Sequence, residues 1–593
     1  MNPAEIQTLL QQGLQLHQSG QLEAAANLYQ QILSAHPQHF DALHLMGVVA
    51  LQNKQHEKSQ TLFESAIQIN PRHFHALNNY GNLLLEIGKM DESLAAFEKA
   101  IQINPQFFQA HFNRGNTLLE LGRYHEAIES YQHCLKIDPQ QPQIYYNLGN
   151  AQKELKEFDQ AIQSYQNALR IHPNYKESFN NCGVAHKELK QYPEAEACYI
   201  KALAIDPQFA AAYCNQGILQ TTTGQYQKAI TSFDAAIQIQ PAYAEAYNNR
   251  GTAFQELMQL DQALLNYQKA IDLSPNYADA HYNKAYVLLQ QKKFAEGLAE
   301  HEWRKELPTY LKYRPLIQKP LWQADVSLEG KTILVFCEQG LGDTTQFSRF
   351  VEPLSKLAAK VIFAVPKPLL SLLAPPNERV TIVDEKQLPT DFDYYCPLLS
   401  LPHCLRVDVE GISSAKPSLT LDGNKVDQWQ AHLGPKKQSL RVGITWSGNP
   451  DFKKDHLRSF LLKDFLKCLP EQGIEYLSLQ QVIRPRDQDL ANQCTNIQFV
   501  QKEIKDFSDT AALIQCVDLV VTSCTSIAHL AGSLGKPCWV IIPFAPDWKW
   551  FTDSASSPWY PSVKLFRQTK PGDWDSALSA VRHDLSALAH STS

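Results

Sequence analysis

The stretch GNTLLELGRYHEAIESYQHCLKIDP, residues 115–139, decides the fold of the first half of the chain, because its spacing recurs. Gly115 and Pro139 each have counterparts at 34-residue intervals. The glycines are Gly13, Gly47, Gly81, Gly115, Gly149, Gly183, Gly217 and Gly251, with Ala285 in the ninth place. The prolines are Pro37, Pro71, Pro105, Pro139, Pro173, Pro207, Pro241 and Pro275. A fixed period of this length predicts a stack of supersecondary units.

A small residue follows most of these glycines after 12 positions, and it completes the pattern of one unit. These residues include Ala25, Ala127, Ala161, Ala195, Ala229 and Ala263. The spacing places each glycine and its alanine on facing sides of two antiparallel helices, where small side chains let the backbones approach. Proline ends the second helix, because it lacks the donor and clashes with the preceding turn. Each helix pair leaves an apolar face for the next, so we expect a superhelix with a concave groove.

The pattern resembles the tetratricopeptide repeat over about residues 3 to 305, which implies about nine repeats. It weakens near the end, where Gly297 takes the alanine place and EGLAEHEWR (296–304) brings in Trp303. We expect a cap or a joint there. The first predicted domain is therefore 1–308, an all-α superhelix that binds a protein acceptor.

Asparagine recurs at 34-residue intervals in seven repeats, each time two residues before the repeat glycine or Ala285, and we call this set the asparagine column. The packing of the helices does not require asparagine at this place. Gln11 and Leu45 replace asparagine in the first two repeats. An amide offers donors and an acceptor, so a row of them can hold an extended peptide by its backbone. The alternative is that each asparagine only bonds a neighbouring helix. The column resembles the one in the superhelix of O-GlcNAc transferases, which implies acceptor binding by Asn79, Asn113, Asn147, Asn181, Asn215, Asn249 and Asn283.

From about Leu328 the chain alternates short apolar runs with helix-like stretches. The predicted strands of a first series lie in 331–337, 360–366, 379–384 and 392–402. A second series follows the polar stretch 417–438, in 440–450, 475–480, 497–500, 518–523 and 537–543. Two such series predict two doubly wound α/β halves, 309–430 and 431–593, facing each other across a cleft. This is the GT-B architecture, in which the last helix, here 573–591, often packs on the first half.

The first strand ends in EQGLGDTTQF, which contains Gly340, Gly342 and Asp343. Glycines at the carboxyl end of a strand let a ligand approach the backbone, and a carboxylate there projects into the cleft. Sugar transfer requires a base that takes the acceptor proton, and Asp343 is the best candidate. The alternative role for Asp343 is a helix N-cap. Heptosyltransferases carry a similar GD motif with that Asp as proposed base.

The second half opens with ITWSGNPDFKKDHLRS, a strand followed by a loop rich in hydrogen-bond donors. Donors there can bind phosphate, and its basic side chains can neutralise a departing phosphate. A solvated basic loop is the alternative. Gln480, at the end of a later strand, is a weaker candidate for bonding a base or ribose. The donor-binding candidates are Ser447, Gly448, Asn449, Lys453, Lys454, Arg458 and Gln480.

The stretch TSCTSIAHLAGSLGKP, residues 522–537, predicts a strand that turns into a helix. Thr525 and Ser526 fall in the first turn, where unpaired backbone N–H groups and the helix dipole favour an anion. His529, one turn later, is either another phosphate ligand or a histidine packed between helix and sheet. A nucleophilic Cys524 would need an adjacent base, and no Cys/His pairing is visible in the sequence.

The segments DTAALIQCVDLVV (509–521) and SIAHLAGSLGKPCWVIIP (526–543) resemble the donor-binding half of glycosyltransferase families 9 and 41. Heptosyltransferases generally carry Asp where this chain has Cys524, so the resemblance does not transfer heptose as the donor sugar. Asp547, Trp548 and Trp550 are candidates for lining the donor pocket, with a hydrophobic lid or core as the alternative.

Composition narrows the class of protein further. The net charge is −7 and the chain has no blocks of like charge, so its charge does not indicate binding to nucleic acid or to an anionic membrane. The N-terminus lacks a signal-peptide pattern and no apolar run is long enough to span a bilayer, so we expect a soluble, cytoplasmic protein. The 12 cysteines form no CxxC pair and no metal-ligand spacing, which predicts reduced, buried thiols.

Together these patterns predict a glycosyltransferase that modifies a protein held by the repeats. The chain resembles bacterial proteins that join tetratricopeptide repeats to a family 9 or 41-like domain, flagellin glycosyltransferases among them. The resemblance implies a nucleotide sugar as co-substrate, no cofactor, no metal, and Ser or Thr of flagellin or another protein as acceptor. Two alternatives are a repeat scaffold with a non-catalytic transferase-like domain, and a transferase acting on a lipid-linked glycan.

Overall fold

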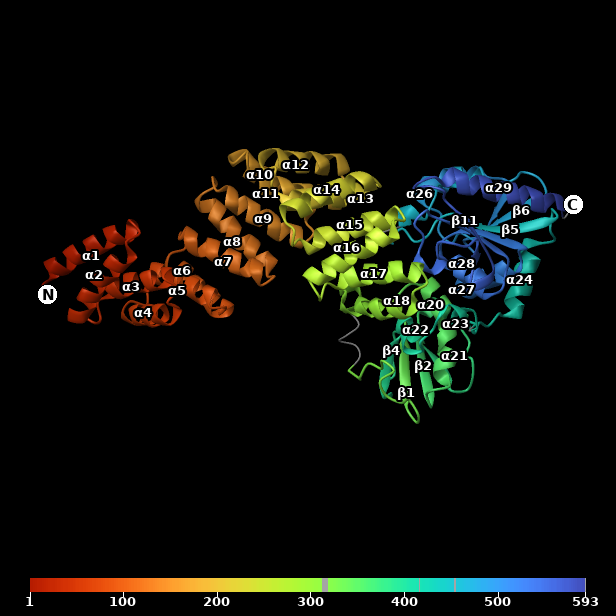
Figure 1. The fold of residues 1–593 in the computed structure, drawn as a ribbon, viewed down its shortest axis with the longest axis horizontal. Helices are drawn as coiled ribbons and strands as arrows, with labels where there is room; N and C mark the ends of the chain where they lie inside the picture. The colour runs from red at the N-terminus through yellow and green to blue at the C-terminus, as the bar shows by residue number, and fades with distance from the viewer. Residues whose placement is uncertain (312–317, 415, 453–454, 592–593) are drawn as a thin grey trace. The chain divides into compact units, whose positions relative to one another are not determined.

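The computed structural model describes residues 1–311, 318–414, 416–452 and 455–591 (Figure 1). The chain divides into two compact units, Met1–Leu219 and Gln220–Ser593. The division lies inside helix α13 (Ala210–Thr222), and the last repeats belong to the same unit as the sheets.

The first unit consists of antiparallel helix pairs that stack on one another. Its helices are α1 (Pro3–Gln18), α2 (Leu22–Ala35), α3 (Phe40–Gln52), α4 (His56–Ile69), α5 (Phe74–Glu86), α6 (Met90–Ile103), α7 (Phe108–Glu120), α8 (Tyr124–Ile137), α9 (Pro142–Glu154), α10 (Phe158–Ile171), α11 (Lys176–Glu188) and α12 (Tyr192–Ile205). Each even-numbered helix ends two residues before a repeat proline, as the missing N–H of proline predicts.

The repeat glycines lie under aromatic rings. A Cβ built on Gly149 would come within 2.6 Å of Tyr165, 16 residues later on the facing helix. The same contact recurs at 2.5 to 2.9 Å in the repeats of Gly13, Gly47, Gly81, Gly115, Gly183 and Gly251. The glycine column therefore makes room for a column of buried Tyr and Phe rings, which we did not predict.

The second unit continues the helix pairs and then forms two sheets. Its remaining helices are α14 (Tyr226–Ile239), α15 (Ala244–Glu256), α16 (Leu260–Leu273), α17 (Ala278–Gln290), α18 (Phe294–His301), α19 (Pro308–Leu311), α20 (Leu341–Phe347), α21 (Val351–Ser355), α22 (Leu401–Cys404), α23 (Val409–Ser414), α24 (Gly423–Leu433), α25 (Leu462–Leu466), α26 (Pro485–Gln493), α27 (Phe507–Gln515), α28 (Ser526–Ser533) and α29 (Trp574–Ser591). α18 is short, and the predicted joint is present: Gln290 donates to the carbonyl of Pro546 at 2.7 Å.

The first sheet is parallel, with the order β3-β2-β1-β4 among the described residues. Its strands are β1 (Thr332–Phe336), β2 (Lys360–Val365), β3 (Val380–Asp384) and β4 (Tyr394–Pro397).

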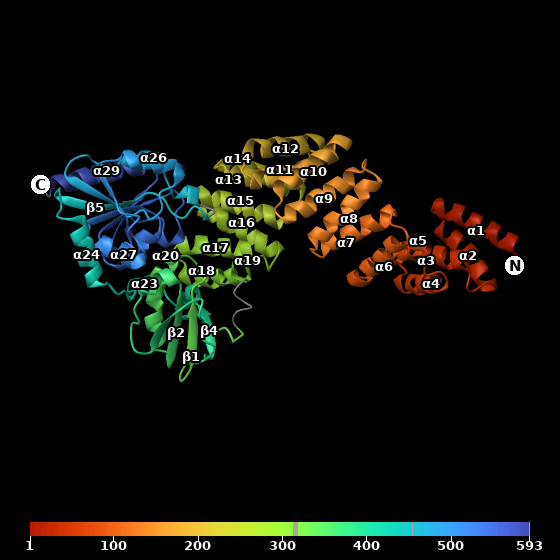
Figure 2. The ribbon, with the colours of Figure 1, turned by 180° about the vertical axis from the view of Figure 1, so that it is seen from behind.

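The second sheet has the order β10-β11-β9-β8-β5-β6-β7 and is parallel except for the β10–β11 pair. Its strands are β5 (Leu440–Thr445), β6 (Ile474–Ser478), β7 (Ile497–Phe499), β8 (Leu519–Ser523), β9 (Cys538–Ile542), β10 (Ser556–Ser557) and β11 (Tyr560–Arg567). Figure 2 shows α26 and α29 on one side of this sheet and α24 and α27 on the other.

The terminal helix corrects one expectation. Val581, Leu585 and Ala589 of α29 are buried in a core with strands β5 and β6 of the second sheet. The prediction that this helix packs on the first half is therefore wrong, because its apolar face covers the sheet that it follows.

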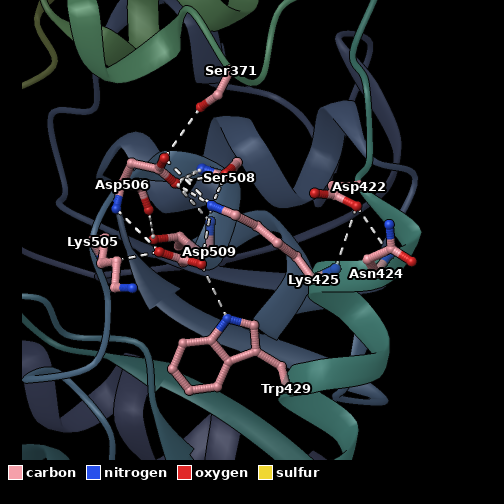
Figure 3. Close-up of polar contacts among 10 residues, drawn as sticks. Ser371, Asp422, Asn424, Lys425, Trp429, Lys505, Asp506, Ser508 and Asp509 are labelled. Atoms are coloured by element: carbon pink, nitrogen blue, oxygen red, sulfur yellow. Dashed lines mark hydrogen bonds and ion pairs between the residues drawn. The ribbon is translucent and has the colours of Figure 1, made fainter.

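The polar stretch between the sheets is partly helical, and Figure 3 shows how it is anchored. Lys425 of α24 lies 3.1 Å from Asp506 and 3.2 Å from Asp509 at the start of α27. The Trp429 indole donates to Asp509 at 3.3 Å, and the Ser371 hydroxyl donates to Asp506 at 3.3 Å. Asp509, the first residue of the DTAALI segment, thus holds α24 against α27.

Candidate functional site

The order of the second sheet places its switch point between β5 and β8. The chain runs from β5 through β6 to β7 at one edge and returns to β8 on the other side of β5. Open α/β sheets bind ligands at the carboxyl ends of the strands beside such a reversal. The loop that begins at Trp446 and the turn at Cys524 follow these two strands, so the predicted donor-binding segments lie at this point.

Arg458 joins these two segments. Its guanidinium donates to the Cys524 carbonyl at 3.1 Å and to Asp455 at 3.3 Å, and it stacks on the Phe452 ring at 4.4 Å. Gly448 lies against the same group, because a Cβ there would come within 2.7 Å of Asp455 and 2.9 Å of Arg458. A buried carboxylate therefore anchors Gly448 and Arg458, whereas residues 449–452 between them are exposed.

A second arginine, which we did not single out from the sequence, completes this loop. Arg484 donates to the Gly448 carbonyl at 2.8 Å and also pairs with Asp455. Beside it lies a cavity of about 360 Å³, lined by Gly448, Pro450, Val482, Arg484, Pro485 and Arg486. A lining that combines apolar side chains with two arginines suits a planar base attached to phosphate.

Gln480 has a structural role. Its Oε1 accepts from the backbone N–H groups of Trp446 and Ser447, both at 3.2 Å. Its Nε2 donates to the carbonyls of Ser447 and Val482 at 3.0 and 3.1 Å. The amide is used within the chain, so Gln480 supports the loop and does not offer a free group to a base or ribose.

Lys453 and Lys454, also predicted in this loop, lie outside the described residues. Ser447 is buried, and its hydroxyl has no hydrogen-bond partner among the described residues. A buried, unpartnered hydroxyl next to the switch point is available to a ligand.

The turn after β8 begins α28 as predicted, one residue later than expected. Thr525 is the N-cap, and Ser526 is the first helical residue. The Thr525 hydroxyl does not cap the helix, since it lies 3.3 Å from that of Thr522. The first-turn N–H groups thus keep no side-chain cap, as an anion-binding turn requires.

Cys524 is buried, and its sulfur accepts a hydrogen bond from the Trp550 indole at 2.8 Å. Burial and the nearby Asp547 raise the pKa of the Cys524 thiol to about 11. The thiol is therefore protonated near neutral pH, which argues against a nucleophilic role. Trp548 and Trp550 are also buried, in agreement with the core alternative.

Gly342 brings the two halves together. A Cβ at this position would come within 3.0 Å of the His529 ring and 3.2 Å of the Ser526 Cα, so any larger residue would separate α20 from α28. Gly340 is exposed and forms the N-cap of α20. Asp343 is the third residue of that helix and makes no cap, so the N-cap alternative for Asp343 is wrong.

Asp343 instead belongs to a charged group that we call the lysine cluster, formed by Asp343, Asp547, Lys549 and Tyr286. Lys549 Nζ lies 3.1 Å from Asp343 and 3.0 Å from Asp547. The Tyr286 hydroxyl, from helix α17, donates to Asp547 at 2.6 Å. Lys549 is buried, whereas the side chains of Asp343 and Asp547 are 21% and 24% exposed, so both carboxylates reach solvent.

The electrostatics of the lysine cluster follow from this arrangement. Burial lowers the pKa of Lys549, but the two carboxylates outweigh it and the net shift is upward. Burial raises the pKa of Asp547, but Lys549 and Tyr286 hold it below its usual value. Lys549 therefore remains a cation beside Asp343 across the physiological range.

His529 matches the second of its two predicted roles. It is buried, stacks on Trp550 with ring centroids 5.1 Å apart, and its Nδ1 lies 3.1 Å from the Tyr560 hydroxyl. Burial and the nearby Lys549 lower its pKa to about 3. His529 is a neutral packing residue between helix and sheet, which does not favour phosphate binding.

The asparagine column makes hydrogen bonds between repeats. Asn113 donates to Asn78 at 3.1 Å and to Asn82 at 2.8 Å in the preceding repeat. Similar bonds run from Asn79 to His44, Asn147 to Asn116, Asn181 to Asn150, Asn215 to Asn180 and Asn283 to Asn248. Asn249 also has a partner. These contacts agree with the structural alternative, and Asn113 and Asn181 each direct two amide hydrogen bonds within the chain.

Sequence reasoning missed Arg484, Lys549 and Tyr286. The segment APDWKWF contains Asp547 and Lys549, two residues apart. Because the segment is rich in aromatic residues, we interpreted it as the lining of a pocket. Tyr286 lies about 260 positions away in a repeat helix, so no local pattern connects it with Asp547.

Comparison with known proteins identifies the helical region. A family profile described as TPR repeat matches residues 81–122, 115–156 and 221–257. Two profiles described as tetratricopeptide repeat match residues 142–175, 177–209 and 244–277, and residues 198–231 and 266–299. The N-terminal region is built of tetratricopeptide repeats. A profile of anaphase-promoting complex, cyclosome, subunit 3 matches residues 18–100 of the same region.

Among curated proteins, the chain is similar to protein FlbA of Caulobacter vibrioides, with 25% identity over 332 residues. The match covers 52% of this chain and 55% of FlbA, so the chain spans about half the length of this relative.

Solved structures with similarity to the tetratricopeptide repeats cover less than half of the chain. YrrB, described as a TPR protein with an unusual peptide-binding site, is 25% identical over 31% of this chain and 95% of its own, with a TM-score of 0.28. A tetratricopeptide repeat protein from Parabacteroides merdae is 17% identical over 42% of this chain and 98% of its own, with a TM-score of 0.37. Among the described residues, no helix combines the length and apolar character needed to cross a membrane.

Proposed function

We propose that the second unit is a glycosyltransferase that moves a sugar from a nucleotide sugar to a side-chain hydroxyl of a protein. One observation carries the proposal. Gly342 lets α20, the helix that carries Asp343, pack against Ser526 and His529 of α28, whose uncapped first turn lies beside the switch point of the second half. A carboxylate on one of two packed helices and an anion-binding helix start on the other are the two groups that sugar transfer from a phosphate to a hydroxyl requires.

The donor is assigned to the second half. Its diphosphate lies at the start of α28 and is contacted by Ser526 and Arg458, with the base in the cavity beside Arg484. Arg458 and the helix start stabilise the charge that develops as the sugar–phosphate bond breaks. The side chains present thus supply positive charge to the leaving group.

Asp343 is assigned as the general base. It takes the proton of the acceptor hydroxyl while the hydroxyl oxygen bonds to the anomeric carbon, and the nucleotide leaves with the electrons of the broken bond. Lys549 pairs with Asp343 and with Asp547. A bound donor phosphate competes for this lysine, which frees Asp343 to accept the proton.

The repeats are assigned to the acceptor. Tetratricopeptide repeats form protein-binding surfaces by stacking, and their last pair contacts the lysine cluster through Tyr286. Flagellin and other proteins with exposed Ser or Thr are the acceptors to test.

Nucleotide binding tests the donor assignment. Calorimetric titration with UDP, GDP, ADP and CMP is expected to reveal one preferred nucleotide, and Arg458→Ala is expected to weaken it about 10-fold or more, because a charge-assisted phosphate contact is lost. Arg582→Ala, on the exposed face of α29, serves as the matched control. Equal affinity of the wild type and the Arg458 variant for every nucleotide would contradict the donor site.

The ion pair between Asp343 and Lys549 favours a second candidate, a scaffold whose transferase-like domain binds but does not catalyse. Lys549 Nζ lies against a carboxylate oxygen of Asp343, which is the group that an acceptor hydroxyl would have to contact. Nucleotide binding without any sugar transfer would support this candidate over the first.

A further inference from the structure

Two cysteines and a histidine lie together in the sixth repeat, away from the site described above. Cys182 and His186 are one turn apart on α11, and Cys198 lies on the facing helix α12. Their ligand atoms all lie within 4.8 Å of one another, and this is the one such Cys/His/acidic group among the described residues. The sequence did not reveal this group, because its third member, Cys198, lies on the next helix and outside the segment that holds Cys182 and His186.

The positions of these three residues are also in contact in other repeats. In the fifth and seventh repeats, the residues at the places of His186 and Cys198 are hydrogen-bonded: Ser164 donates to Gln152 at 2.7 Å, and Ser232 donates to Gln220 at 2.8 Å. The places of Cys182 and Cys198 also meet in the fourth repeat, where Arg114 donates to Ser130 at 2.7 Å. These three positions are therefore in contact wherever their residues are polar.

The sixth repeat alone fills these positions with metal-binding groups. The eight other repeats carry neither Cys nor His at any of the three aligned places, from Gln12, Leu16 and Leu28 in the first repeat to Lys284, Leu288 and Glu300 in the ninth. Packing alone does not require thiols and an imidazole here, because Gln and Ser fill the same space in the adjacent repeats.

The His186 ring is held by a hydrogen bond. Its Nδ1 lies 2.6 Å from the Gln191 amide oxygen, and in the tautomer that carries the proton on Nδ1, Nε2 is the nitrogen that coordinates. Metal-binding histidines are usually held in this way by a second hydrogen bond. Cys182 is buried, whereas His186 and Cys198 are partly exposed, so an ion can reach the group from solvent.

We propose that Cys182, His186 and Cys198 bind one thiophilic d10 metal ion, Zn²⁺. Two thiolates and one imidazole are a donor set that zinc prefers, and with the divalent ion they form a neutral group. Binding releases the two thiol protons. Three protein ligands leave a fourth tetrahedral position for water or for a donor from a partner, so the site can stiffen the repeat or respond to zinc.

Zinc titration of the reduced, metal-stripped full chain tests the proposal. We expect the wild type to take up one Zn²⁺ against a chromophoric chelator and to give the intense visible absorption of tetrahedral thiolate-bound Co²⁺. The double variant His186→Gln/Cys198→Ser should lose both signals. It restores the Gln and Ser pair of the fifth and seventh repeats, so it is expected to fold.

Cys134→Ser is the matched control, because it removes a buried thiol of the same unit from outside the group. It should bind zinc like the wild type. Saturating zinc should also raise the Tm of the wild type and of this control but not that of the double variant. Equal zinc uptake by the wild type and the double variant would overturn the proposal, and so would a wild type that forms a Cys182–Cys198 disulfide on oxidation but takes up no zinc when reduced.

Discussion

At the scale of single residues, the proposed sugar transfer depends on Asp343, which forms an ion pair with Lys549. Asp343→Asn keeps the size of the side chain and removes the base, so sugar transfer should fall about 10²- to 10⁴-fold. Nucleotide affinity should not fall, because Lys549 loses a carboxylate that competes with the donor phosphate. Initial rates with a saturating donor, alongside calorimetric nucleotide binding, measure the two effects. Glu352→Gln, an exposed carboxylate of the same half, is a suitable control. Unchanged transfer by Asp343→Asn would exclude it as the base.

His529 predicts a pH dependence of stability. In the native state its pKa is lowered from 6.5 to about 3, because burial and Lys549 disfavour the charged ring. Below pH 6.5 the unfolded state therefore binds a proton that the native state excludes. The free energy of unfolding should fall as pH drops from 6.5 towards 3, by up to about 1.4 kcal/mol per pH unit from this residue.

His529→Gln should flatten this part of the profile. Denaturant unfolding followed by tryptophan fluorescence is suitable, since His529 stacks on Trp550. His583→Gln changes an exposed histidine and should leave the profile unaltered. Identical profiles for the wild type and His529→Gln would show that the buried ring does not produce the pH dependence.

At the scale of elements, the contact between glycine and aromatic ring sets the distance between paired helices. Gly149→Ala would place a methyl group 2.6 Å from the Tyr165 ring, and overpacking of this kind costs about 1 to 3 kcal/mol. Thermal unfolding followed by circular dichroism should show a lower transition. Gly423→Ala, where the methyl group meets no atom within 4 Å, should be neutral or stabilising. A Gly149→Ala variant as stable as the wild type would mean that the helices can separate without cost.

The fold was predictable where the pattern is periodic. The interval of 34 residues located the helix pairs, and the β-branched runs located β1 to β9. Strands β10 and β11 were missed, because the tryptophans around 548–559 masked the alternation in Tyr560–Arg567. The packing of α29 was predicted from a resemblance and was wrong, because the apolar face of this helix covers the second sheet, which it directly follows.

The site was only partly predictable. The glycines before α20, the loop after β5 and the start of α28 can each be recognised from a local sequence pattern. All three lie at the carboxyl ends of strands. Gln480 and the asparagine column show the limit of such patterns. The sequence suggested that their amides bind a ligand, but in the fold these amides make hydrogen bonds within the chain. The partners of Asp343 and His529 depend on tertiary contacts that no spacing reveals.

At the scale of the whole molecule, the largest core of the second unit contains residues of both sheets. Buried residues of α18, the first sheet, α28 and the tryptophans at 548, 550 and 559 belong to the same apolar cluster. Arg349 locks this core, since its guanidinium donates to the carbonyls of Ile412 and Trp559, both at 3.1 Å. The last repeats are therefore part of the unit that carries the proposed catalytic site.

The most direct test of the account is turnover of nucleotide sugars by the purified wild-type chain. We predict that one class among UDP, GDP, ADP and CMP sugars is hydrolysed slowly without an acceptor, with release of the free nucleotide, and that Asp343→Asn lacks this activity. If the wild type turns over no member of these four classes, the proposal that the second unit is a nucleotide-sugar-dependent transferase is contradicted.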